Sequence, residues 1–249
     1  QAITKPVYDH ATGTFGEPEE VQPRPIVIVR GLFPLFTRRL RDAFDVSVWL
    51  DPDEHLKYHW KIQRDVAQRG YLLEEVIGHI VERQVDHHEY IQPQAAFADR
   101  VVRFCPSPGY LRSRRDGTPD NSHLNVQIIQ RPALPRVNLT DILEPAGDGR
   151  RVSVREYEGH HQDASVGVIE IDGDIAAADA ARLEDRIWAH MPTHQHLRPD
   201  EIGTYLDGDR PCHSDPLALT QLLIAYQIVA AWDRRGLRLS KPVAAISGS

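Results

Sequence analysis

The chain is poor in cysteine, which limits the ways in which its fold can be stabilised. Among 249 residues there are two cysteines, Cys105 and Cys212. They lie far apart in the sequence and form neither a C-x-x-C motif nor a zinc-type spacing. A reduced cytoplasmic protein is the simplest interpretation, although the sequence leaves a long-range disulfide open.

Long hydrophobic runs and an excess of positive charge are also missing. No run approaches the length of a membrane span, and no charged-then-apolar leader precedes the first residues, so we expect a soluble protein without a membrane partner. The formal net charge of −7 argues against nucleic acid as a partner, because nucleic-acid binders neutralise many phosphates. With 41% hydrophobic residues, the chain can bury one or two ordinary cores.

Two short apolar runs and one charged helix organise the first part of the chain. Residues 25–29 form a β-branched run bounded by Pro and Gly, which is typical of a parallel strand covered on both faces. Residues 45–50 form a second run. Asp51 and Pro52 then predict the start of a helix that extends to about Gly70. This order of elements indicates an α/β sheet, and ligands of such sheets lie beyond the carboxyl ends of the strands.

The remaining elements follow from periodicity and from turn residues. Residues 1–24 are polar and turn-rich, and we expect them to form a loop that approaches a ligand. Residues 105–122, rich in Pro, Gly and Ser, mark a domain boundary between segments 1–104 and 123–235, with a tail at 236–249. Helices are expected at 35–43, 72–84, 176–190 and 215–232, and strands at 101–104, 123–130, 152–157 and 165–171.

One face of the charged helix is a candidate binding site. Lys61, Arg64, Asp65 and Arg69 have the spacing i, i+3, i+4, i+8, so they share a face. Three cations and one carboxylate on one stripe can clamp phosphate groups. The alternative is a solvated face held by an Asp65–Arg69 pair worth a few tenths of a kcal/mol, and spacing alone favours this alternative.

Several histidines raise the question of a metal site. They are adjacent in the sequence or in loops, not at the i, i+4 helical spacing of zinc motifs, and no cysteine joins them. We therefore expect no metal site at His160, His161, His190, His194 or His196.

The motif around the charged helix resembles a known enzyme family. It reads K-x-x-R-D-x-x-x-R-G from Lys61 to Gly70 and follows a strand that ends in Leu-Asp. Together with four further segments, it closely resembles the phosphoribulokinases of the Calvin cycle, and most of all their longer plant, cyanobacterial and archaeal type. These segments are KPVYDHATGTF at 5–15, HHEYIQPQAAFADRVVRF at 87–104, VGVIEIDGDI at 166–175 and HSDPLALTQLLIAYQI at 213–228. The matches run from end to end in family order.

The resemblance implies a fold, a reaction and partners. The fold would be α/β, a partial P-loop kinase parallel sheet with helices on both faces, plus a carboxy-terminal α+β portion. The reaction would be the ATP-dependent phosphorylation of D-ribulose 5-phosphate to ribulose 1,5-bisphosphate, with Mg²⁺ as a cofactor. The protein would be a cytoplasmic homodimer.

The resemblance also assigns roles to the four residues on the helix. Lys61 and Arg64 would contact the phosphates. Asp65 would support the metal or the acceptor, and Arg69 would close over the transferred group. We therefore expect Asp65, Arg64 and Arg69 to be catalytic and Lys61 to bind the substrate.

Three residues near the amino terminus join the expected site only through the resemblance. As bare loop residues, Lys5, Tyr8 and His10 would be solvated side chains. In the resembling enzymes the matching K-P-x-Y-x-H segment lies by the sugar-phosphate site. We therefore expect these three side chains to bind the sugar phosphate.

The chain departs from the family pattern in two ways. It contains no G-x-x-x-x-G-K-[ST] phosphate-binding loop, which we interpret as a lost amino-terminal segment. The isolated chain is therefore expected to be inactive. Arg30 also stands where the family has a metal-supporting glutamate, so we expect no metal ligand there. A guanidinium about 4 Å from a cation would repel each of its charges by roughly 4 kcal/mol at an effective dielectric constant of 20.

Two alternatives stay open at this point. A uridine-kinase-like enzyme shares the first half of the architecture, but it would not need residues 152–232. A non-catalytic relative that binds or scaffolds is favoured by Arg30 and by the missing loop.

Overall fold

The computed structural model describes most of the chain. It covers residues 2–9, 12–22, 24, 26–132, 139, 142–143, 153–161, 164–191, 194, 198–199 and 201–234.

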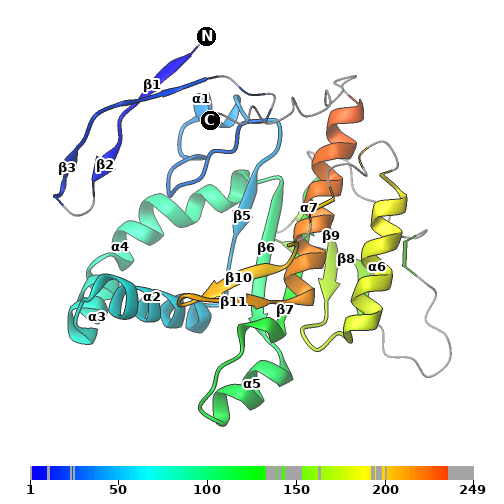
Figure 1. Cartoon of the computed structure of the whole chain (residues 1–249). Helices are drawn as coiled ribbons and strands as arrows, with labels where there is room; N and C mark the ends of the chain where they lie inside the picture. Colours follow the sequence, from blue (N-terminus) through cyan, green and yellow to red (C-terminus); the bar gives the residue numbers. More distant parts are fainter. Residues whose placement is uncertain are drawn as a thin grey trace, which may run out of the picture.

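A mixed five-stranded sheet forms the centre of the fold (Figure 1). Strand β5 (Val48–Leu50) pairs in parallel with β6 (Arg100–Pro106). The other neighbours are antiparallel, in the order β6, β7 (Leu124–Gln130), β9 (Ala164–Ile171) and β8 (Val154–His161). The predicted α/β class is confirmed. The sheet continues across the expected boundary at 105–122, and the division into separate domains stays a prediction.

The main core lies between one face of the sheet and two helices, α6 (Ala177–Ala189) and α7 (Asp215–Arg234), which run side by side in Figure 1. Ile128 of β7 lies opposite Ile169 of β9, and both are fully buried. Alternation along each strand sends every second side chain to this face. The predicted helices at 176–190 and 215–232 therefore form, and Ser214 accepts a hydrogen bond from the backbone N–H of Leu217 at the start of α7.

A smaller core covers the other face of the sheet. Val101 and Val168 point into it and pack with Leu35, which lies just before the short helix α1 (Arg38–Arg41). The helix expected at 35–43 is thus shorter than predicted. It begins after Thr37, whose side chain accepts a hydrogen bond from the backbone N–H of Leu40.

The charged helix α2 (Glu54–Arg69) starts later than the sequence predicts. Its N-cap is Asp53, which accepts a hydrogen bond of 2.9 Å from the backbone N–H of His55. Asp51 instead pairs with Arg103 of the neighbouring strand, so its carboxylate is not the helix cap. The predicted end is confirmed, because Gly70 closes the helix in the left-handed conformation with a φ of 71°.

Further helical segments connect α2 to β6. They are α3 (Leu73–Glu82), α4 (Gln84–Asp86), the π-helical turn η1 (His87–Ile91) and the 3₁₀ turn η2 (Gln92–Phe97). Of the apolar stripe predicted at 72–84, Val76 is buried, whereas Ile77 and Val81 are exposed.

The strand predicted at 25–29 is wrong for residues 26–29, while residue 25 is not among the described residues. Ile28 is 87% exposed and Val27 is 69% exposed. A strand is held by a ladder of backbone hydrogen bonds to a neighbour, and none of the described strands pairs with this segment. An apolar run is therefore left at the surface.

The loop predicted at 1–24 is instead a β-sheet arm. Strand β1 (Ile3–Lys5) pairs with β4 (Glu19–Val21), and β2 (Tyr8–Asp9) pairs with β3 (Thr14–Phe15). Gly13 turns the chain between β2 and β3 with a φ of 70°, where glycine meets no steric penalty. The rings of Tyr8 and Phe15 pack edge to face across the pair at 5.5 Å.

Two further elements lie where the sequence predicts none. Helix α5 (Pro108–Arg115) occupies part of the expected boundary, and strands β10 (Thr204–Asp207) and β11 (Arg210–His213) form a hairpin. Both cysteines are free thiols, so the disulfide left open by the sequence is not formed. No helix in the described part of the chain is long and apolar enough to cross a membrane.

Candidate functional site

The four residues predicted on one face of α2 come together around a buried carboxylate. Asp65 is only 3% exposed. Its Oδ2 accepts a hydrogen bond of 2.8 Å from Lys61 Nζ. Its Oδ1 accepts one of 2.8 Å from Arg64 Nε and lies 3.2 Å from Arg69 Nη1. The Asp65–Arg69 pair of the alternative interpretation is present, but as part of a larger cluster.

The electrostatics of this Asp65 cluster favour an ionised carboxylate. Burial alone would raise the pKa of Asp65, but the hydrogen bonds from Arg64 and Lys61 outweigh it and lower the pKa to about 2. Three positive charges therefore face one negative charge. The side chains of Arg64 and Arg69 are about half exposed, at 47% and 49%, so both guanidinium groups can also meet an anion from solvent.

Two further pairs of polar side chains lie near the carboxyl end of β5. Lys57 Nζ is 2.8 Å from His87 Nε2, and Arg103 Nη2 is 2.7 Å from Asp51 Oδ2. Burial lowers the pKa of both Lys57 and His87, and the positive charge of Lys57 lowers that of His87 further. The sequence analysis missed both pairs. No local sequence pattern predicts these pairs, because the two residues of each pair are 30 and 52 residues apart in the sequence, respectively.

Two of the three amino-terminal residues expected to bind the sugar phosphate, Lys5 and Tyr8, lie on the β-sheet arm. Lys5 pairs with Glu19 at 3.5 Å, and Tyr8 packs on Phe15, so both side chains contact their own arm. In Figure 1 the arm, in dark blue, is drawn apart from α2. His10 lies outside the described residues. The sugar-phosphate role of Lys5, Tyr8 and His10 stays a prediction.

A preassembled metal cluster is not found in the described part of the chain. The described residues contain no group of three or more His, Cys, Asp or Glu side chains that could hold an ion. Arg30, at the position where the resembling enzymes have a glutamate, is exposed in the unpaired segment before α1. The sequence also contains no G-x-x-x-x-G-K-[ST] phosphate-binding loop.

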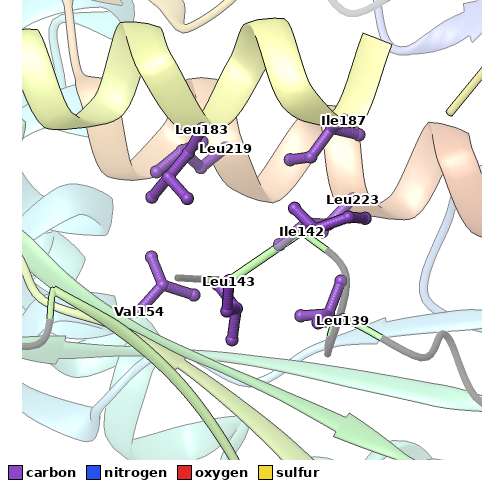
Figure 2. A pocket seen from close by; sticks show the side chains of 8 residues that line it. All are labelled: Leu139, Ile142, Leu143, Val154, Leu183, Ile187, Leu219 and Leu223. Atoms are coloured by element: carbon purple, nitrogen blue, oxygen red, sulfur yellow. The ribbon is translucent and has the colours of Figure 1, made fainter. Parts of the chain in front are cut away.

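An apolar cavity in the main core does not suit a charged ligand (Figure 2). It has a volume of about 10 Å³ and lies among β8, α6, α7 and the segment around residue 142. Its lining is aliphatic throughout and consists of Leu139, Ile142, Leu143, Val154, Leu183, Ile187, Leu219 and Leu223. A cavity this small and this apolar stays dry, so the Asp65 cluster is the better candidate.

Comparison with known proteins finds similarity in the first part of the chain. Residues 1–108 match the phosphoribulokinase/uridine kinase family. Over 107 residues the chain is 43% identical to a phosphoribulokinase of Synechocystis, covering 43% of this chain and 32% of the relative. It is 42% identical over 106 residues to the chloroplastic phosphoribulokinase of Arabidopsis thaliana, covering 43% and 27%. A uridine kinase of Lactiplantibacillus plantarum is 36% identical over 104 residues, covering 41% and 50%.

The fold first defines a class, an α/β protein whose mixed sheet with helices is consistent with a P-loop kinase. Within this class, residues 1–108 are similar to the phosphoribulokinase/uridine kinase family. All four residues of the Asp65 cluster lie inside this segment. The chain spans about a third of the length of the Synechocystis relative.

Proposed function

We propose that the protein is a phosphoribulokinase, which transfers a phosphoryl group from ATP to D-ribulose 5-phosphate and forms ribulose 1,5-bisphosphate and ADP. The observation that carries the proposal is the Asp65 cluster, with three cations around one buried carboxylate. The names of the similar proteins support the sugar phosphate as the acceptor. We also propose the cytoplasm as its location, the Calvin cycle as its pathway and a homodimer as its assembly.

The proposed roles follow from the charge that develops during phosphoryl transfer. Negative charge spreads over the oxygens of the transferred group, and fixed cations stabilise it most when they are oriented in advance. Lys61 and Arg64 would hold the phosphates, and Arg69 would close over the transferred group. Asp65 would keep all three cations in place and support the acceptor.

ATP and Mg²⁺ are required by the proposed reaction, but the described residues provide no cradle for either. We propose that Arg30 weakens metal binding by repulsion, because a nearby guanidinium opposes a divalent cation. In a full-length version of the protein, Arg30→Glu should raise the turnover or the affinity for Mg²⁺. No gain in either quantity would show that metal repulsion is the wrong explanation.

The test of the proposed function is a substitution inside the Asp65 cluster. In the full-length protein, Arg64→Ala should lower kcat/KM for ribulose 5-phosphate by about 100-fold or more, because a charge that stabilises the transition state is lost. Arg39→Ala, an exposed arginine on α1, is the matched control and should leave kcat/KM unchanged. Equal kinetics for Arg64→Ala and wild type would contradict the proposal. A change in circular dichroism as large as the activity loss would assign Arg64 a structural role instead.

Uridine phosphorylation is the second candidate, since a uridine kinase is 36% identical to the chain over 104 residues. A nucleoside phosphorylation assay separates the two. Turnover of uridine without turnover of ribulose 5-phosphate would favour the uridine kinase. If neither substrate is turned over, the result would favour a non-catalytic binding relative.

A further inference from the structure

The two sides of α2 have different partners. The Asp65 cluster occupies one side. Leu56, Trp60 and Gln63 have the spacing i, i+4, i+7 and lie on the opposite side of the helix. This second side holds α2 against the rest of the molecule, and we call it the seat of α2.

The apolar part of the seat is a small, separate core. Leu56 is 1% exposed and packs with Tyr110 of α5 and with Leu124 of β7. The ring of Trp60 meets Phe104 edge to face at 6.3 Å. These contacts keep the helix close to the sheet, but apolar packing alone has little directional preference.

Two hydrogen bonds fix the orientation of α2. The indole Nε1 of Trp60 donates a hydrogen bond of 2.9 Å to Asn121 Oδ1, in the 3₁₀ turn η3 (Asn121–His123). The amide Nε2 of Gln63 donates one of 2.8 Å to Asp207 Oδ1, at the end of β10. Figure 1 shows the β10–β11 hairpin reaching across to α2. Because hydrogen bonds are directional, the two contacts together fix the rotation of the helix about its axis.

Most partners of the seat lie after residue 108 in the sequence. Tyr110, Asn121, Leu124 and Asp207 all follow residue 108, where the match to the kinase family ends. The family-matched segment therefore carries the Asp65 cluster, while the later segment carries most of its support.

We propose that the region after residue 108 orients the Asp65 cluster, with Asn121 and Asp207 as positioning residues for the reaction. This inference rests on the proposed function, since it concerns the same site. A rotation of α2 would displace the tips of Lys61, Arg64 and Arg69, and displacements of about 1 Å can cost up to 100-fold in rate.

The test breaks the contact between α2 and the hairpin. In the full-length protein, Asp207→Ala should lower kcat/KM for ribulose 5-phosphate about tenfold. Gln63→Ala, which removes the same contact from the side of α2, should give the same loss. Asp207→Asn keeps a carbonyl oxygen for the Gln63 amide and should restore most of the activity. The matched control is Asp209→Ala, an exposed carboxylate of the same hairpin, with wild-type kinetics.

The outcomes separate the positioning role from the proposed function. If the wild type turns over ribulose 5-phosphate and both alanine variants match it, the positioning role is wrong and the function stands. If the wild type has no turnover, the function is wrong, and amide hydrogen exchange over residues 54–69 decides the positioning role. Faster exchange in Asp207→Ala than in Asp209→Ala would support it, and equal exchange would contradict it.

Discussion

Helix α2 and the segment 26–36 both lie within residues 1–108, which match the kinase family, yet their surroundings differ. The helix buries Leu56 on one side and Asp65 on the other, and its long-range partners are among the described residues. The segment exposes large apolar side chains, among them Ile28 at 87% and Phe33 at 50%. Strand β5, the parallel edge of the sheet, likewise exposes Leu50 at 64%.

The two regions differ because one depends on contacts within a helix and the other on contacts with a distant strand. The Asp65 cluster forms within three turns of one helix, so residues 61–69 contain all of its ion pairs. A strand needs a neighbour from elsewhere in the sequence, and residues 26–29 have no such neighbour among the described strands. Stability should therefore depend strongly on the sheet core and on α2, and little on the exposed segment.

The largest expected effect compares two isoleucines. Ile128, in the centre of β7, is fully buried, whereas Ile28 is 87% exposed. Ile128→Ala should lower the free energy of unfolding by about 3 kcal/mol, because it leaves a cavity in the main core. Ile28→Ala should change it by less than about 0.5 kcal/mol. Urea unfolding of both variants measures the difference, and similar losses would show that residues 26–29 are packed after all.

A smaller effect is expected when the Asp65 cluster loses its charge. Asp65→Asn should destabilise the protein by about 2 kcal/mol at pH 7, since three cations would then surround a neutral amide. The control is Asp42→Asn, which removes the exposed partner of Arg38 in a pair at 3.5 Å and should cost under about 0.5 kcal/mol. Equal costs measured by urea unfolding would mean that the Asp65 cluster is only a surface network.

The smallest effect concerns the contact between α2 and η1. Burial, Lys57 and His88 lower the pKa of His87, while Glu54 and Asp51 oppose them. Protonation is therefore harder in the folded state, and the stability that comes from a neutral His87 is lost as the pH falls below 6.5. His87→Gln should reduce this acid loss in thermal unfolding between pH 7 and pH 5. His88→Gln should keep most of the loss, because burial and Lys57 still lower the pKa of His87, and the reverse pattern would contradict the assignment.

Short-range features were predictable from the sequence. The shared face of Lys61, Arg64, Asp65 and Arg69 follows from helical spacing, and Gly70 ends the helix as predicted. The burial of Asp65 was not predictable, because it depends on packing outside the helix. The cap at Asp53 was also missed, since Asp51 carries the same signal but is held by Arg103 from another strand.

Long-range contacts account for the other failures. The seat of α2 joins Trp60 to Asn121 and Gln63 to Asp207, over separations of 61 and 144 residues. Helical periodicity contains no information about such partners. One missed element did have a signal, because the Gly-Asp pair at 208–209 is typical of a two-residue hairpin turn, and Gly208 has a φ of 63°.

The most direct test of the account is the titration of the Asp65 carboxyl group, followed by carbon-13 NMR. The account holds that Lys61, Arg64 and Arg69 converge on this carboxylate, so the titration midpoint should lie near pH 2. The stability that comes from these ion pairs should then be present above about pH 4 and be lost as the pH falls through 2. A midpoint close to 3.8, the ordinary value for an aspartate, would show that the three cations do not surround Asp65.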